Sequence, residues 1–300
     1  KENDARVSIL KAIELDPSIT NNYLEIAHLL FEKPDFEESI RYLRSAIRLD
    51  PENAQGYINI GLILNLIGEI SESNKELIQV NRTNLSTYQQ KLEASIFLLL
   101  NYFILADFEK FSNILNQINM FMINHKQFVI EDKSNKKSLF AFYNLCRSLY
   151  KQLDVRENSL STKNIFHIGD SHCLSFAHHN LLIFSESMVV QSLLIMGAKA
   201  WHFASDKSNK WKAAFIEQIK NKSYSDYCLI SFGEIDCRKN EGILPYSIKY
   251  GKDPYKVCIE TINGYLDYME VNLSKVYSKR FYFGVSAPLL KAKNKDELDL

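Results

Sequence analysis

The string AIELDP at residues 12–17 returns as AIRLDP at residues 46–51, a shift of 34 residues. The same shift superposes several further positions: Tyr23 on Tyr57, Ala27 on Gly61, Phe36 on Ile70 and Ser39 on Ser73. Small residues at 27 and 61 let paired helices approach closely, and each Asp-Pro pair is expected to start the next helix. The repeat therefore predicts stacked antiparallel helix pairs over about the first 80 residues, with Ala27 and Gly61 at equivalent contacts.

This period resembles that of tetratricopeptide repeats. The resemblance implies a helical repeat domain that binds a protein partner. From residue 88 onward the register fades, yet helical periodicity continues to about residue 152, which favours degenerate repeats or helices that seal the stack. We place this domain at residues 1–152 and interpret the charged run EDKSNKK (131–137) as a solvated loop.

After the polar stretch 154–163 the pattern changes to short apolar runs typical of β-strands. These runs are NIFHIG (164–169), SMVVQSLLIMG (187–197), DYCLISFG (226–233) and RFYFGVSAP (280–288). Helical patterns at 209–221 and 253–279 lie between the later strands, as expected for a parallel sheet with crossover helices. The sequence therefore predicts an α/β domain after the helical one.

Candidate site residues follow the predicted strands, because ligands bind at the carboxyl ends of parallel strands. Gly169, Asp170, Ser171 and His172 follow the first strand, and Gly197 follows the second. GEIDCR (233–238) follows the third strand and SAP (286–288) the fourth. We expect Ser171, Gly197, Gly233 and Asp236 to lie at one edge of the sheet.

Gly-Asp-Ser follows the first predicted strand, a glycine follows the second, and Gly-x-x-Asp follows the third. This order resembles the SGNH or GDSL hydrolase superfamily over residues 160 to about 290. The resemblance implies a flavodoxin-like three-layer α/β/α domain at 160–300, fused to the repeats as in a bacterial helical-repeat protein. It also implies that Ser171 is the nucleophile and that the backbone N–H of Gly197 serves the oxyanion hole. No cofactor or metal is implied.

Two features depart from the superfamily pattern. Ile235 stands where the superfamily has an Asn that donates a hydrogen bond, so Arg238 is a candidate replacement donor. The superfamily takes its base from a D-x-x-H block near the carboxyl terminus, whereas the last histidine here is His202. We therefore expect the chain to be incomplete at its carboxyl terminus, with the base beyond residue 300.

Each of the neighbouring polar residues has two interpretations. Asp170 either caps the following turn or takes part in catalysis, and His172 is expected to contact substrate rather than act as the base. Glu234, Asp236 and Arg238 either orient a sugar hydroxyl or form an internal ion pair. We expect Lys199, Trp201 and His202 to form a platform on which a sugar ring stacks. The alternative is that Trp201 is buried against a helix.

Composition excludes several function classes. Lys plus Arg and Asp plus Glu each number 36, which argues against a nucleic-acid partner. The five cysteines form no C-x-x-C pair, and no apolar run reaches the length of ~18–20 residues that spans a bilayer. We expect a cytoplasmic protein without a membrane span, although the chain begins at Lys1 and its native start is expected to be missing.

The sequence thus predicts an SGNH-type serine esterase or O-acyltransferase that acts on an ester, with an O-acetylated glycan as the candidate substrate. One alternative is a non-catalytic repeat scaffold whose α/β domain binds a glycan or a partner, which Ile235 favours. Another is a metallophosphoesterase, because Asp170-Ser171-His172 spells D-x-H after a strand. That class needs further ligands on later strands, and no histidine follows His202.

Overall fold

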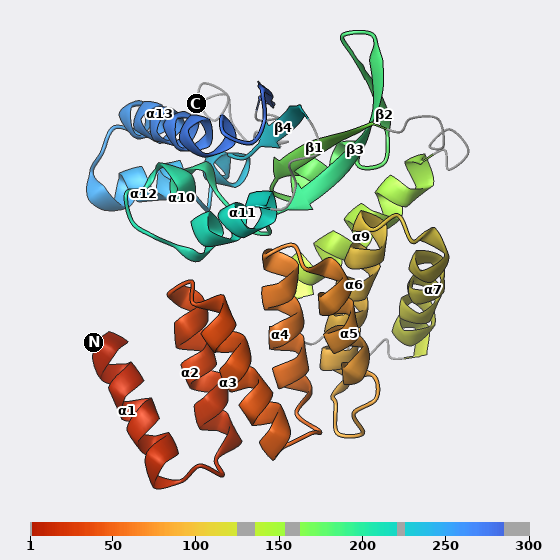
Figure 1. The fold of residues 1–300 in the computed structure, drawn as a ribbon, viewed down its shortest axis with the longest axis vertical. Helices are drawn as coiled ribbons and strands as arrows, with labels where there is room; N and C mark the ends of the chain where they lie inside the picture. Colours follow the sequence, from red (N-terminus) through yellow and green to blue (C-terminus); the bar gives the residue numbers. More distant parts are fainter. Residues whose placement is uncertain (1, 125–135, 154–162, 221–225, 285–300) are drawn as a thin grey trace.

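A computed structural model shows a stack of helices joined to a β-sheet that carries its own helices (Figure 1). The structure describes residues 2–124, 136–153, 163–220 and 226–284. The fold is therefore α plus β, with helical repeats first and a mixed sheet after them. Most of EDKSNKK and all of SAP lie outside the described residues.

The stack consists of paired helices, and their bounds are α1 (Glu2–Leu15), α2 (Thr20–Glu32), α3 (Phe36–Leu49), α4 (Ala54–Leu66), α5 (Ile70–Val80), α6 (Tyr88–Ile104), α7 (Phe108–Asn124) and α9 (Lys136–Gln152). Helices α2, α4 and α6 begin at residues 20, 54 and 88, so each starts 34 residues after the last. The helical register therefore continues into a third pair, although the matching residues fade. Pro17 and Pro51 lie in the turns before α2 and α4, not in their first helical turns as predicted.

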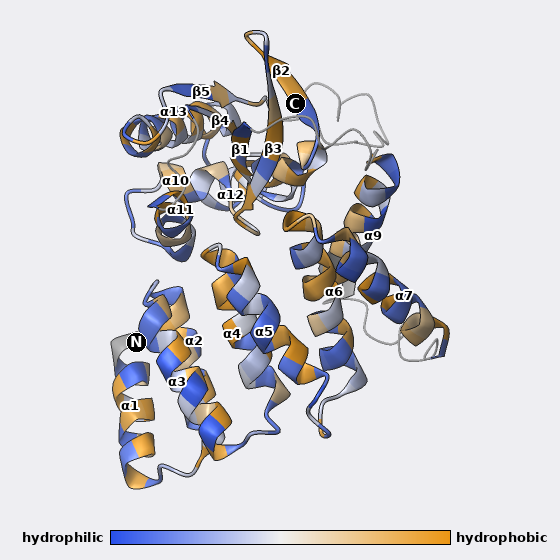
Figure 2. Cartoon of the chain, turned by 45° about the vertical axis from the view of Figure 1, so that its right-hand side comes forward, coloured by the Kyte–Doolittle hydropathy of each residue, from blue (hydrophilic) through white to orange (hydrophobic). Residues whose placement is uncertain are grey.

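Ala27 and Gly61 occupy equivalent contacts, as predicted. The Ser39 hydroxyl donates to the Ala27 carbonyl oxygen at 2.6 Å, and the Ser73 hydroxyl donates to the Gly61 carbonyl oxygen at 2.7 Å. A Cβ at Gly61 would lie 2.8 Å from the Leu77 side chain, so a small residue is needed where α4 meets α5. Figure 2 shows that the stacked helices carry hydrophilic and hydrophobic stretches side by side, as amphipathic helices do.

A buried amide network joins three helices of the stack. The Asn101 side-chain nitrogen donates to Ser73 Oγ at 3.1 Å and to Asn74 Oδ1 at 2.9 Å. The Asn101 side-chain oxygen accepts from Asn65 Nδ2 at 2.6 Å. Because Asn101 is fully buried, each of these groups depends on the others for its hydrogen bonds.

Five strands form the sheet, and their bounds are β1 (Asn164–Gly169), β2 (Asn180–Ile183), β3 (Glu186–Leu194), β4 (Tyr227–Ser231) and β5 (Lys279–Tyr282). Their order is β2-β3-β1-β4-β5; β3, β1, β4 and β5 run parallel, and β2 pairs antiparallel with β3. The antiparallel edge strand β2 was not predicted, because its apolar run is only four residues long. Between β1 and β2 stands the short 3₁₀ helix η2 (Ser171–Phe176).

Helices α10 (Ala200–Ala204), α11 (Lys210–Lys220) and α13 (Pro254–Leu273) pack on one face of this sheet, and α12 (Ile243–Tyr250) packs against α13 and the loop after β4. Phe166 and Ile230 pack with Phe203, Phe215 and Met269 on that face. The hydrophobic cluster of the opposite face contains only strand residues and Phe176 of η2 in the described part of the chain. Of the three layers expected, the described residues show the sheet and a helical layer on one side of it.

The helix ends of the stack abut the carboxyl edge of the sheet. The Gln218 side chain donates to the carbonyl oxygens of Leu66 and Leu194, both at 2.8 Å. His178 Nε2 donates to the Phe103 carbonyl oxygen at 2.6 Å. The last carbonyls of a helix have no partner within it, so these side chains satisfy the carboxyl ends of α4 and α6. The division into domains at residues 1–152 and 160–300 stays a prediction, and the two regions share hydrophobic clusters.

We predict that Asn101→Ala destabilises the chain by about 2–4 kcal/mol, because it leaves the amides of Asn65 and Asn74 buried with fewer hydrogen bonds. Asn113→Ala, on the exposed face of α7, is the matched control and is expected to change stability by less than about 0.5 kcal/mol. Urea unfolding followed by circular dichroism measures both. Equal midpoints for the two variants would show that the network contributes little.

Candidate active site

The candidate site lies where β1 and β4 end side by side. Gly169 pairs with Ser231 in the register of these parallel strands, and Leu194 of β3 flanks Gly169 on the other side. The chain leaves β1 toward β3 and returns to β4 on the opposite side, so the connections diverge here. Such a divergence opens a crevice at the carboxyl ends of the strands, and ligands bind there in parallel sheets.

Gly169 permits the close approach of the two strands. A Cβ at this position would lie 2.5 Å from the Ser231 carbonyl oxygen and closer still to Ser231 Oγ. The next backbone N–H, that of Asp170, donates to the same carbonyl oxygen at 3.2 Å. Only glycine therefore lets Ser231 lie over the end of β1 while the chain turns outward into η2.

Asp170 and His172 form a hydrogen-bonded pair at the start of η2. Asp170 Oδ1 accepts from the His172 backbone N–H and lies 2.9 Å from His172 Nδ1. The hydrogen bond to Asp170 raises the pKa of His172 above its ordinary value of 6.5, against the lowering effect of partial burial. Asp170 is 1% exposed, whereas the His172 side chain is 41% exposed. Asp170 therefore both caps the turn and orients an accessible imidazole.

One side of η2 packs with the helical stack. Cys173, Leu174 and Ala177 are buried in the hydrophobic cluster that includes α6 and α9. The Ser192 hydroxyl donates to the Cys173 carbonyl oxygen at 2.7 Å and ties η2 to β3. Residues three apart in a 3₁₀ helix share a face, so His172 and Ser175 point to the same side. The stack thus holds η2 with its polar side toward the crevice.

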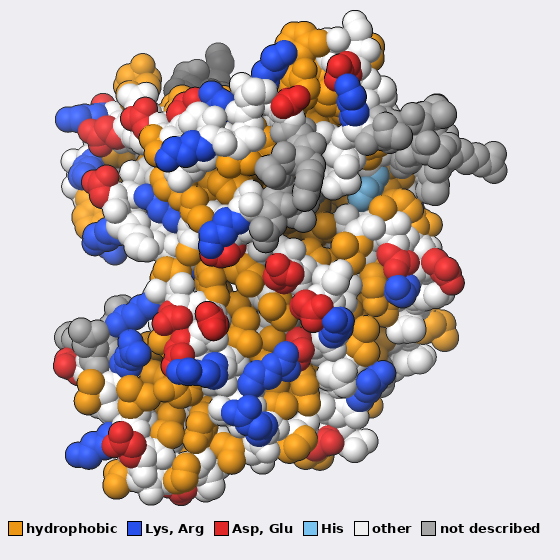
Figure 3. Space-filling model, viewed as in Figure 1, with side chains coloured by type: hydrophobic (Ala, Val, Ile, Leu, Met, Phe, Trp, Pro, Cys, Tyr) orange, Lys and Arg blue, Asp and Glu red, His pale blue; other side chains and the backbone are white. Residues whose placement is uncertain are grey.

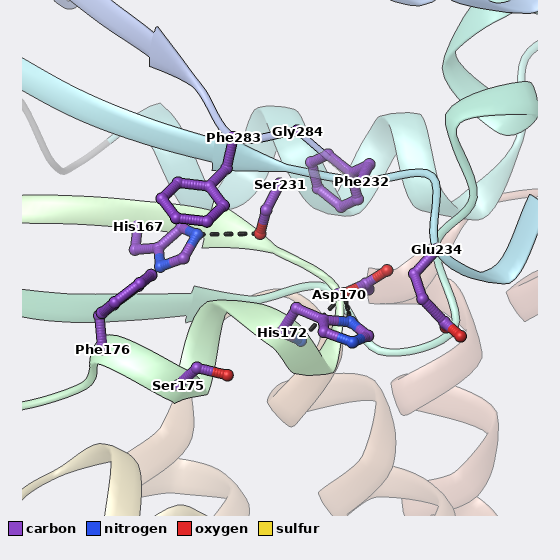
Figure 4. A pocket seen from close by; sticks show the side chains of 10 residues that line it. All are labelled: His167, Asp170, His172, Ser175, Phe176, Ser231, Phe232, Glu234, Phe283 and Gly284. Atoms are coloured by element: carbon purple, nitrogen blue, oxygen red, sulfur yellow. Dashed lines mark hydrogen bonds and ion pairs between the residues drawn. The ribbon is translucent and has the colours of Figure 1, made fainter. Parts of the chain in front are cut away.

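A cavity of about 170 Å³ occupies this crevice (Figure 4). The described residues that line it are His167, Asp170, His172, Ser175, Phe176, Ser231, Phe232, Glu234, Phe283 and Gly284. The rings of Phe176, Phe283 and His167 form one cluster (Figure 4): the two phenyl centroids lie 5.2 Å apart, and they lie 5.9 and 6.3 Å from the His167 centroid. Apolar walls therefore surround a small number of polar groups, as in a small-molecule site.

His167 and Ser231 form a second polar pair, at the buried end of the cavity. His167 Nε2 lies 2.9 Å from Ser231 Oγ. Burial lowers the pKa of His167 to about 4, so its imidazole is neutral near pH 7. Among the described residues, His167 Nδ1 and Asp170 Oδ2 are buried without a hydrogen-bond partner.

The loop after β4 contributes Glu234 to the cavity wall and uses its other polar residues internally. Arg238 Nε donates to both Glu234 carboxylate oxygens, at 3.1 and 3.0 Å, which is the internal ion pair considered above. Asp236 is buried and accepts from the backbone N–H groups of Ala200 and Trp201, at 2.7 and 3.2 Å. Burial raises the pKa of Asp236. Asp236 therefore fastens the β4 loop to the amino terminus of α10.

The predicted sugar platform does not line the cavity. The platform stays a prediction, and the 44% exposure of Trp201 contradicts only its alternative, a Trp201 buried against a helix. The His202 ring is buried and stacks on Trp211, with centroids 3.6 Å apart. Lys199 Nζ lies 3.8 Å from a Glu241 carboxylate oxygen. These residues stabilise the loop between β3 and α11 in the described structure.

Ser171, Gly197, Gly233 and Asp236 all follow the carboxyl ends of parallel strands, as predicted. The structure brings Asp170, His172 and Glu234 to the cavity, but Ser171, Gly197 and Arg238 are not among its described lining residues. Gly197 is exposed in a left-handed turn with φ of 71°. Sequence reasoning missed His167 and Ser231; a polar residue near the end of each buried strand was the available signal.

Metal and nucleic-acid binding find no support in the described residues. No group of three or more His, Cys, Asp or Glu side chains in these parts of the chain is placed to hold a metal ion. On the face shown in Figure 3, acidic and basic side chains are interspersed over the helices instead of gathering by sign. None of the helices that the structure describes has both the length and the apolar character needed to cross a bilayer.

Comparison with known proteins supports the helical region. Residues 20–53, which span α2 and α3, match the tetratricopeptide repeat family. No curated protein matches the chain. Stacked repeats of this kind generally mediate contacts between proteins. The amino-terminal region of this chain thus contains a tetratricopeptide repeat, which indicates a protein-interaction module.

Proposed function

We propose that the cavity at the ends of β1 and β4 hydrolyses or transfers an acyl ester, as an SGNH-type serine hydrolase would. The observation that carries the proposal is the Asp170–His172 pair beside the cavity, one residue on either side of Ser171. A buried carboxylate behind an accessible imidazole is the arrangement that lets histidine act as a general base. An O-acetylated glycan is the proposed substrate, and a protein partner is proposed for the repeats.

The proposed step uses Ser171 as the nucleophile and His172 as the proton acceptor. Ser171 Oγ attacks the ester carbonyl carbon, and its proton passes to His172 Nε2. The imidazolium then returns the proton to the departing alcohol as the C–O bond breaks, which leaves an acyl-serine. Water, or the hydroxyl of an acceptor, repeats the sequence and releases the acyl group.

Neighbouring side chains in a 3₁₀ helix point about 120° apart. His172 therefore takes the Ser171 proton through one intervening water molecule rather than by direct contact, a route that general bases also use. This proposal departs from our expectations that His172 contacts substrate and that the base lies beyond residue 300, and the Asp170–His172 hydrogen bond is what supports it. Because Ile235 has no polar side chain, the donors for the oxyanion come from other groups of the site.

The second candidate function is binding without catalysis. It is favoured by the Glu234–Arg238 ion pair, which leaves Arg238 engaged within its own loop, and by Ile235 at the position of the usual donor. A cavity of this kind still holds a small ligand between its aromatic walls. The two candidates differ in one measurable property, which is turnover of an ester.

We predict that Ser171→Ala and His172→Gln each lower kcat/KM for a small acetyl ester by about 100-fold or more, because each removes a partner in proton transfer. Ser208→Ala, at an exposed position outside the cavity, is the matched control and keeps full activity. Hydrolysis of 4-nitrophenyl acetate measures all three, with thermal unfolding as a check on folding. Unchanged activity in Ser171→Ala contradicts the serine mechanism.

We also predict that kcat/KM falls as the pH is lowered, with a midpoint above 6.5, because the reaction needs neutral His172 and Asp170 raises its pKa. The other charged groups that act on His172 are Glu234, which raises its pKa, and Arg238, which lowers it. Asp170→Asn is expected to move the midpoint to lower pH, since it removes the largest cause of the shift. An unmoved midpoint in a pH–rate profile would assign the titration to another group.

A further inference from the structure

The His167–Ser231 pair has no part in the proton transfer described above, yet it stands at the buried end of the same cavity. His167 is 1% exposed and Ser231 is 9% exposed. Burying an imidazole costs free energy unless both ring nitrogens find partners. Among the described residues, Nε2 has Ser231 and Nδ1 has none.

Counting protons shows what this pair offers. A neutral imidazole and a hydroxyl carry one polar hydrogen each, and their mutual hydrogen bond uses one of them. If Ser231 donates to Nε2, the remaining hydrogen is on Nδ1; if Nε2 donates to Ser231, it is on the hydroxyl. Either tautomer leaves one uncharged donor, and among the described residues neither group has another partner.

Asp170 supplies the complementary group. Its Oδ1 is occupied by His172, while Oδ2 is buried without a partner among the described residues. The residues that line the cavity thus include one neutral donor, one carboxylate with an unpartnered oxygen and the apolar rings of Phe176 and Phe283. A small neutral group with a carbonyl oxygen, a polar hydrogen and a methyl group matches this set.

We propose that His167 and Ser231 form a carbonyl anchor, which binds the neutral carbonyl oxygen of a small acetyl-type ligand while Asp170 Oδ2 accepts a hydrogen bond from the same ligand. An acetamido group meets both requirements. Anions of the same size are rejected, because two carboxylates, those of Asp170 and Glu234, line the cavity with one histidine, His172, that can carry a positive charge, while burial keeps His167 neutral. An O-acetyl ester has no polar hydrogen to donate to Asp170 Oδ2, so this ligand is distinct from the acyl end of the proposed ester, and the anchor does not rest on the proposed function.

Two probes of nearly equal shape test whether the cavity prefers a neutral ligand to an anion: acetamide, which is neutral, and acetate, which is anionic. The full chain is labelled with ¹⁵N in its histidine rings, and the His167 signals are assigned by their loss in His167→Phe. At pH 7.5, acetamide is expected to shift the His167 ring nitrogens saturably, whereas acetate at the same concentration leaves them unshifted. Ser231→Ala is expected to weaken acetamide binding at least fivefold.

The matched controls are Ser208→Ala and His28→Phe, which change the same residue types at exposed positions outside the cavity. Both should bind acetamide within a factor of two of the unaltered chain. The anchor is refuted if acetamide up to roughly 100 mM, equivalent to about −1.4 kcal/mol, leaves the His167 signals of the unaltered chain in place. It is also refuted if acetate binds equally well, or if Ser231→Ala binds acetamide as tightly as its control.

These outcomes are independent of the hydrolysis assay. A chain that binds acetamide at His167 but turns over no ester contradicts the proposed catalytic function and leaves the anchor in place. A chain that hydrolyses 4-nitrophenyl acetate but leaves His167 unaffected by acetamide contradicts the anchor and keeps the serine mechanism. The acetamide titration itself uses the unaltered chain, and only the assignment of the His167 signals uses a variant.

Discussion

The burial of one side of η2 against the helical stack determines how the candidate site is presented. Cys173, Leu174 and Ala177 lie in a hydrophobic cluster with residues of α6 and α9, so they cannot turn toward solvent without exposing apolar surface. Because the helix is short and tightly wound, His172 and Ser175 must then face the other way. The polar wall of the cavity is therefore a consequence of apolar packing behind it, and the repeats are part of the site's support.

Side-chain hydrogen bonds near η2 also join the helical stack to the sheet region. His178 follows η2 directly and donates to the carboxyl end of α6, and Gln218 links the carboxyl end of α4 to β3. Burying a helix end costs little free energy when side-chain donors contact it, because the last carbonyl groups keep their hydrogen bonds. A partner that binds the repeats would thus act on a stack that shares a hydrophobic cluster with η2.

The polar groups of the sheet edge divide into two classes by burial and partner. Asp236, His202 and Arg238 are satisfied by groups of the fold, and they stabilise the loops around the crevice. His167 and Asp170 each keep one buried atom without a partner among the described residues. Buried polar atoms without partners cost free energy and are uncommon. Their positions therefore indicate a ligand site more specifically than the residue types alone.

The sequence by itself determined what repeats along the chain: the 34-residue period, the helix-pair contacts of Ala27 and Gly61, and the parallel strands that bring Ser171 and Gly233 to one edge. These follow from periodicity and chain direction, which are local properties. Only the tertiary structure decided that His172 pairs with Asp170, that Asp236 caps α10 and that His167 meets Ser231. Their partners lie up to 64 residues away, and side-chain direction at a strand end depends on packing that no local pattern records.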